Sequence, residues 1–127
     1  MKTKIIAVYK KEDEIAKIIN KIKNYSFDEF QKHRHYEFSI LEKATDEKML
    51  KETFYKFNLI KTIELIENER GEKHFSFNYE LPDGTFLVIA LALDKEPPII
   101  INGYHSHKNY KQFEKSLRKN YADKFFY

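Results

Sequence analysis

Thr85-Phe-Leu-Val-Ile-Ala-Leu-Ala-Leu93 is the longest apolar run of the chain. It lies between a Pro82-Asp-Gly84 turn and a segment that contains Pro97 and Pro98. A strand with one face in water would alternate apolar and polar residues, whereas here both alternating sets are apolar. The pattern therefore predicts a central strand that is covered on both faces.

Further strands are predicted on both sides of this run. From Leu59 the hydrophobic period changes to two, and Arg70-Gly-Glu72 separates residues 59–69 from residues 73–81. The apolar Ile99-Ile-Ile101 segment adds a strand after the prolines. These segments predict a four-stranded antiparallel meander from about Leu59 to Ser106. Within residues 73–81, the predicted solvent-facing set is His74, Ser76, Asn78 and Glu80.

Helices are predicted before and after the meander. An isoleucine stripe indicates a helix over residues 12–24, and the capping-box pattern Ser26-Phe-Asp-Glu29 indicates a second from Phe27 to about Tyr36. Thr45 is the expected cap of a third helix, and residues 109–124 form the last. The predicted fold class is α+β: N-terminal helices, then the meander, then a basic C-terminal helix packed on the sheet. At 127 residues, we expect a single domain over residues 1–127.

The composition excludes several classes of protein. There is no cysteine, so disulfides and thiolate metal sites are excluded. No apolar run reaches the roughly 18 residues of a membrane span, and no small-residue cleavage site follows the short apolar stretch near the N-terminus. We therefore expect a cytoplasmic protein without a membrane partner. Gly-rich phosphate loops and Gly-x-Ser-x-Gly are also missing from the sequence, so we expect no cofactor.

Two histidines and a tyrosine follow the last apolar strand. His105 and His107 are two residues apart, so on a strand they point the same way, about 7 Å from each other. Histidine is the side chain best suited to proton transfer at neutral pH. The segment predicts an acid–base pair beside Tyr104, and the alternative is a polar strand end without a function.

A second His-x-His pair, His33 and His35, lies in the predicted second helix. On a helix the two imidazoles lie on nearly opposite faces, so at most one of them can join a shared site. The alternative for this pair is a solvated helix end. A further alternative is a metal site built from all four residues, His33, His35, His105 and His107.

Positive charge is concentrated at the C-terminal end of the chain. Residues 103–127 carry six Lys or Arg against Glu114 and Asp123, a net +4, so the rest of the chain carries −1. We expect Glu114 and Asp123 to neutralise little of this face, and the first-turn amides of the last helix to hold a phosphate together with Lys108. A basic face beside aromatic residues suits nucleic acid, and its alternative is an ordinary charged helix. The residues concerned are Lys108, Lys111, Lys115, Arg118 and Lys119.

The order of these segments resembles the barnase–colicin D–RelE class of small ribonucleases, with toxins of the RelE and BrnT type nearest in size and order. The similarity covers residues 26–121: a Lys32-His33 pair late in a predicted helix, a meander that contains Pro82-Asp-Gly84, and a last strand followed by a basic helix. RelE-like sites are usually rich in arginine, whereas this chain has only Arg34, Arg70 and Arg118.

The resemblance implies a metal-independent endoribonuclease of toxin type, a hydrolase whose partners are RNA or single-stranded nucleic acid and a protein antitoxin. It implies His105 or His33 as base or acid and His107 as the second group. It also implies that Lys108 and Lys111 bind phosphate and that Tyr104 or Tyr110 stacks on a base. If the scaffold is not catalytic, the alternative is a nucleic-acid- or protein-binding module that uses the basic helix, including Lys115 and Arg118.

Overall fold

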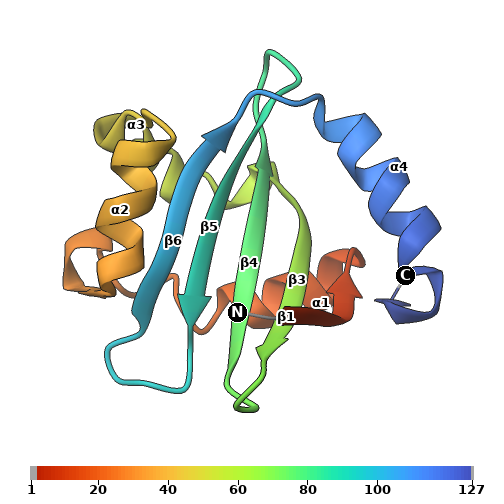
Figure 1. Ribbon diagram of the computed structural model, residues 1–127, viewed down its shortest axis with the longest axis horizontal. Coiled ribbons are helices and arrows are strands. Elements are labelled where there is room, and N and C mark those ends of the chain that lie inside the picture. The colour runs from red at the N-terminus through yellow and green to blue at the C-terminus, as the bar shows by residue number, and fades with distance from the viewer. Residues whose placement is uncertain (1–2, 127) are drawn as a thin grey trace.

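The structure is a computed structural model that describes residues 3–126, and in this range it is α+β with one seven-stranded mixed sheet (Figure 1). β3 to β6 pair as an antiparallel meander, as predicted. β1 adds to β3 in the antiparallel sense, while β2 and β7 pair in parallel with β6 and β1. Across the sheet the order is β2 (Gln31–Lys32), β6 (Ile99–Ser106), β5 (Phe86–Ala92), β4 (Lys73–Glu80), β3 (Ile60–Asn68), β1 (Thr3–Tyr9) and β7 (Phe125–Phe126).

The prediction of a four-stranded sheet is therefore wrong in its width. β2 and β7 are two residues long, and a segment of that length carries no alternation from which a strand can be read. β1 has the composition of a strand, but its pairing with β3 is a long-range contact that the local sequence pattern does not encode.

β5 is an internal strand of the sheet and is buried on both faces, as predicted. Leu87 and Leu91 are 0% exposed and belong to the main hydrophobic core on the first face of the sheet. Phe86 and Val88 point to the second face and pack with Tyr110. Both sides of β5 are apolar because each side packs in a different hydrophobic cluster, one on each face of the sheet.

α1 (Glu12–Ile19), α2 (Arg34–Glu42) and α3 (Glu47–Phe54) cover the first face. α2 and α3 approach β6 closely at Gly103. A Cβ at that position would lie 2.8 Å from Leu50 Cδ2 and 3.0 Å from Tyr36 Cε1. Any side chain there would push the helices away from the sheet, so the glycine fixes how near they come.

The segment before α2 differs from the prediction. The capping box between Ser26 and Glu29 forms, but it caps a short 3₁₀ turn, Phe27–Glu29, instead of a long helix. The chain then extends to pair with the edge of β6, where Gln31 N–H donates to the Pro98 carbonyl at 3.0 Å. This long-range pairing satisfies backbone groups that a helix would otherwise satisfy, and α2 begins only at Arg34.

α4 (Tyr110–Asn120) packs on the second face, as predicted, through Tyr110, Phe113 and Leu117. Figure 1 shows it along one side of the sheet, where it leaves the middle strands without a covering helix. The β4 residues Ser76 and Asn78, predicted to face solvent, are buried on this second face. That prediction is wrong because side chains of the neighbouring strands surround these residues; Asn78, for example, donates to Thr62 and Glu64 of β3. Within residues 3–126, no helix has both the length and the apolar character that crossing a membrane requires.

Candidate functional site

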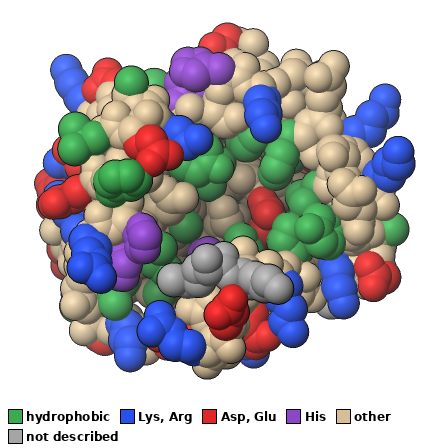
Figure 2. All heavy atoms as spheres, viewed as in Figure 1, with side chains coloured by type: hydrophobic (Ala, Val, Ile, Leu, Met, Phe, Trp, Pro, Cys, Tyr) green, Lys and Arg blue, Asp and Glu red, His purple; other side chains and the backbone are tan. Residues whose placement is uncertain are grey.

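The middle of the second face is a hollow of about 710 Å³. Its floor is low because the middle positions of one cross-strand row carry small side chains. The space-filling view in Figure 2 shows this face hollowed at its centre, with hydrophobic and acidic side chains inside the depression. The row that forms the floor is Glu64, Ser76, Ala90 and Asn102.

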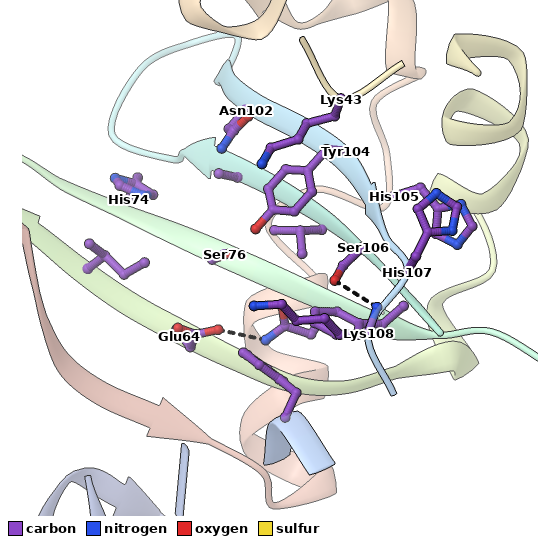
Figure 3. Close-up of a pocket in the computed structure, with 16 residues that line it drawn as sticks. Lys43, Glu64, His74, Ser76, Asn102, Tyr104, His105, Ser106, His107 and Lys108 are labelled. Carbon is purple, nitrogen blue, oxygen red and sulfur yellow. Dashed lines mark hydrogen bonds between the residues drawn. The ribbon is translucent and has the colours of Figure 1, made fainter. Parts of the chain in front are cut away.

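The predicted imidazole pair forms at the rim of this hollow. The ring centroids of His105 and His107 are 4.2 Å apart, and the ring planes meet at 47°. Figure 3 shows the two rings side by side, on the side of β6 away from Tyr104. Because adjacent residues of a strand face opposite ways, Tyr104 points into the hollow while His105 turns toward the first face. The structure therefore brings the imidazoles together but separates them from the tyrosine.

A hydrogen-bond chain holds His105 in one tautomer. The Thr85 hydroxyl donates to Asp83 Oδ1 at 2.6 Å, so its only proton is used there. His105 Nε2 lies 2.8 Å from the same hydroxyl oxygen and must donate to it. In the neutral ring this leaves Nδ1 with a lone pair. A base whose ring is oriented by a third group is the arrangement that acid–base catalysis uses.

The surroundings of His105 also favour its neutral form. Burial and, to a lesser degree, the nearby His107 ring lower the pKa of His105, while Asp83 opposes the shift. The Thr85 hydrogen bonds lower the pKa of Asp83, so this carboxylate stays ionised and keeps accepting the hydroxyl proton. His105 is thus able to accept a proton at neutral pH.

The end of β6 pairs with β5 on one edge, and hydroxyl groups bond to its outer edge, where β2 does not reach. The backbone N–H of His105 donates to Thr45 Oγ1 at 3.2 Å, and the Gly103 N–H donates to Ser39 Oγ at 3.4 Å. An exposed strand edge needs such partners. Thr45 was predicted to cap α3, but Asp46 fills that role by accepting from Lys48 N–H at 3.0 Å.

His33 does not reach the hollow. It precedes α2 as its N-cap, and its ring stacks on His35 with centroids 5.0 Å apart. The prediction that these two imidazoles lie on opposite helix faces is wrong, because His33 is outside the helix. Its backbone N–H donates to Ile100 O, five residues and therefore roughly 16 Å along β6 from His105. The four histidines form no common metal site, and among residues 3–126 no group of at least three His, Asp or Glu side chains could hold a metal ion.

The basic face of α4 points away from the hollow. Phe113 lines the hollow, and residues two positions from it on a helix, Lys111 and Lys115, lie about 160° around the axis. Arg118 donates to Glu114 Oε2 at 2.9 Å, and Lys10 donates to Glu114 Oε1 at 2.8 Å. The expectation that Glu114 neutralises little is therefore wrong. Of the predicted basic contacts, Lys108 lines the hollow.

The start of α4 is also occupied by the protein itself. The Tyr110 N–H donates to Gly84 O at 2.7 Å, and the Gln112 N–H donates to the Asn109 side chain at 3.0 Å. These amides are not available for the predicted phosphate. Tyr110 is 2% exposed, so its ring is closed to a stacking base. Tyr104 remains open toward the hollow, where Lys43 Nζ lies 5.7 Å from the centre of its ring.

Sequence reasoning missed the polar residues of the floor and the orienting chain. Glu64, Asn78 and Asn102 were assigned to strands, and the Asp83–Thr85 hydrogen bonds were hidden in a turn. A usable signal was present: polar residues at every second position of a strand can face an enclosed site as well as solvent. No family model, curated protein or solved structure matches the chain.

Glu64→Gln is expected to stabilise the fold at neutral pH. Burial raises the pKa of Glu64, so the native state holds its proton more tightly than the unfolded chain. Wild-type stability therefore falls as the pH rises from the unfolded-state value of about 4.3 through the higher folded value. The neutral amide avoids this loss and can still accept from Asn78 Nδ2. Thermal denaturation at neutral pH should show a gain on the order of 1 kcal/mol.

The gain should vanish below about pH 4, where the wild-type carboxyl is protonated in both states. A Glu64→Gln protein that is less stable than wild type at neutral pH would contradict this view of the hollow.

Proposed function

We propose that the protein is a metal-independent endoribonuclease in which His105 is the general base and His107 the general acid. The observation that carries the proposal is the contact between the two imidazoles, one of which has its tautomer fixed by Thr85 and Asp83. A structural histidine pair needs no such fixed tautomer, whereas a base must present its lone pair to the substrate.

The reaction requires two proton transfers on one phosphodiester. His105 Nδ1 takes the proton of the ribose 2′-hydroxyl, and the oxygen attacks the adjacent phosphorus. The bond from phosphorus to the 5′-oxygen breaks, and His107 gives that oxygen its proton. The products are a 2′,3′-cyclic phosphate and a free 5′-hydroxyl, with no net gain or loss of protons.

The charge that develops on the phosphorane needs a nearby cation. Lys108 directly follows His107 and lines the same hollow. Lys56 lines a second depression on the other side of His105, between α3 and the turn before β5. Each of the two depressions that His105 lines therefore also contains a lysine that can neutralise a bound phosphate.

The proposal is tested by incubating end-labelled single-stranded RNA with purified protein in excess EDTA. We expect cleavage that continues in the chelator and yields 2′,3′-cyclic phosphate ends, because no step uses a metal ion. Products with 3′-hydroxyl ends, or cleavage that stops in EDTA, would contradict the proposal. Binding of RNA without any cleavage would also contradict it and would favour a non-catalytic binding module.

A further inference from the structure

The orientation of Asn78 on the floor of the hollow is fixed by a relay of hydrogen bonds. Tyr110 gives its hydroxyl proton to Glu114 at 2.9 Å, so it accepts from Thr62 at 3.0 Å. Thr62 then has no proton left, and Asn78 Nδ2 donates to it at 3.0 Å and to Glu64 Oε1 at 2.8 Å. The amide nitrogen must face β3, and its carbonyl oxygen faces the other way.

Among residues 3–126, this carbonyl oxygen, Asn78 Oδ1, has no hydrogen-bond partner, although Asn78 is 1% exposed. Leaving a buried acceptor unpaired costs about 1 to 3 kcal/mol, so native proteins rarely tolerate it without a reason. Asn102, which also lines the hollow, has a second buried acceptor, Oδ1, that finds no partner in the described part of the chain. Within residues 3–126, no hydrogen bond reaches Oε2 of Glu64. The floor therefore contains hydrogen-bond acceptors, Asn78 Oδ1, Asn102 Oδ1 and Glu64 Oε2, to which a bound ligand could donate.

The shape of the hollow suits a flat ring. Ser76 and Ala90 keep the floor low, while the Tyr104 ring and Phe113 stand at its sides. Figure 3 shows the Tyr104 hydroxyl end directed across the sheet toward the strands that carry Ser76 and Glu64. The volume of about 710 Å³ is within the usual range for small-molecule sites, roughly 300 to 1,000 Å³.

The rim of the hollow carries positively charged lysines, whereas the floor carries hydrogen-bond acceptor oxygens. Lys43 lies over the Tyr104 ring at 5.7 Å, and Lys108 lines the hollow at the end of β6. A simple organic cation would meet these two lysines on its way in. A ligand with donor groups at one end and a negative charge at the other matches both the floor and the rim.

We propose that the hollow binds one unstacked nucleotide of single-stranded RNA whose base carries an exocyclic amino group, namely adenine, cytosine or guanine. The two amino protons pair with Asn102 Oδ1 and with one other acceptor of the floor, Asn78 Oδ1 or Glu64 Oε2. The ring lies against Tyr104, and the phosphate leads toward Lys43 and Lys108. Uracil fits poorly because two carbonyl oxygens flank its single N–H and would face the acceptors of the floor. The inference rests on the proposed function for RNA as the ligand and adds which bases are accepted.

The test measures binding without cleavage, by calorimetric titration of the protein with CMP and with UMP. We expect CMP to bind at least about tenfold more tightly than UMP, which corresponds to one or two hydrogen bonds. Ala90→Phe should abolish CMP binding because the ring fills the floor, whereas Ala122→Phe, which adds the same ring at an exposed position, should not. Asn102→Leu should lower the affinity for CMP at least about fivefold and leave UMP unchanged. This second variant tests the site even if Ala90→Phe fails to fold.

Equal binding of CMP and UMP, or unchanged CMP binding in Asn102→Leu, would overturn the inference. A short oligocytidylate should bind more tightly than CMP, and weaker binding would mean that the ligand is a free nucleotide, which also overturns it. Failure here is distinct from failure of the proposed function. RNA cleavage in EDTA without base preference would remove the base site alone, whereas CMP selectivity without cleavage would remove the catalytic proposal alone.

Discussion

Replacing Leu91 by aspartate is expected to abolish the folded state at ambient temperature. Leu91 is 0% exposed near the C-terminal end of β5 and packs in the main core. An unpaired carboxylate there loses its hydration and also deletes the leucine packing, at a combined cost of at least about 4 kcal/mol. A domain of this size has only about 5 to 15 kcal/mol of stability. Circular dichroism during thermal and urea denaturation measures the effect.

Leu41→Asp is the matched control for this experiment. Leu41 is 81% exposed on α2, so the same chemical change should alter stability by no more than about 0.5 kcal/mol. If Leu91→Asp unfolded at the same temperature as Leu41→Asp, β5 would not be a buried internal strand of the sheet.

His105→Ala is expected to lower the rate of RNA cleavage about a hundredfold or more, the usual contribution of a general base. The side chain is only partly buried, and its polar contact is the Thr85 hydroxyl, so the fold should persist. The rate is measured as single-turnover cleavage of labelled RNA in EDTA, with circular dichroism as the check on folding.

His35→Ala is the matched control, because His35 also belongs to a His-x-His pair with its rings in contact but lies near the other end of β6. Its cleavage rate should equal that of wild type. A similar loss in both variants would mean that histidine replacement acts through the fold, and no loss in His105→Ala would exclude it as the base.

The central part of the fold follows from the sequence, and its edges do not. Residues 85–93 predict a strand covered on both faces, and in the structure each of residues 86–91 is buried. The capping box at Ser26 correctly predicts where a helical turn begins, but the predicted helix ends after one 3₁₀ turn because Gln31 pairs with β6. A local pattern can report a local preference, whereas an edge strand is decided by where distant backbone groups remain unpaired.

The candidate site divides in the same way. The contact between His105 and His107 follows from the two-residue period of a strand. Other features depend on how α4 and α2 pack, which periodicity does not determine. They are the burial of Asn78, the direction of Lys111 away from the hollow and the distance of His33 from it. The toxin role and the antitoxin partner stay predictions that come from the resemblance alone.

The most direct test of the central claim is the pH dependence of the single-turnover cleavage rate in EDTA. The base must be deprotonated and the acid protonated, so the account predicts a bell-shaped profile. The rise on the acidic side should lie below the ordinary histidine value of 6.5, because burial and His107 lower the pKa of His105. In His105→Ala this rise should disappear. A wild-type rate that instead climbs steadily with pH, as for attack driven by hydroxide, would contradict the account.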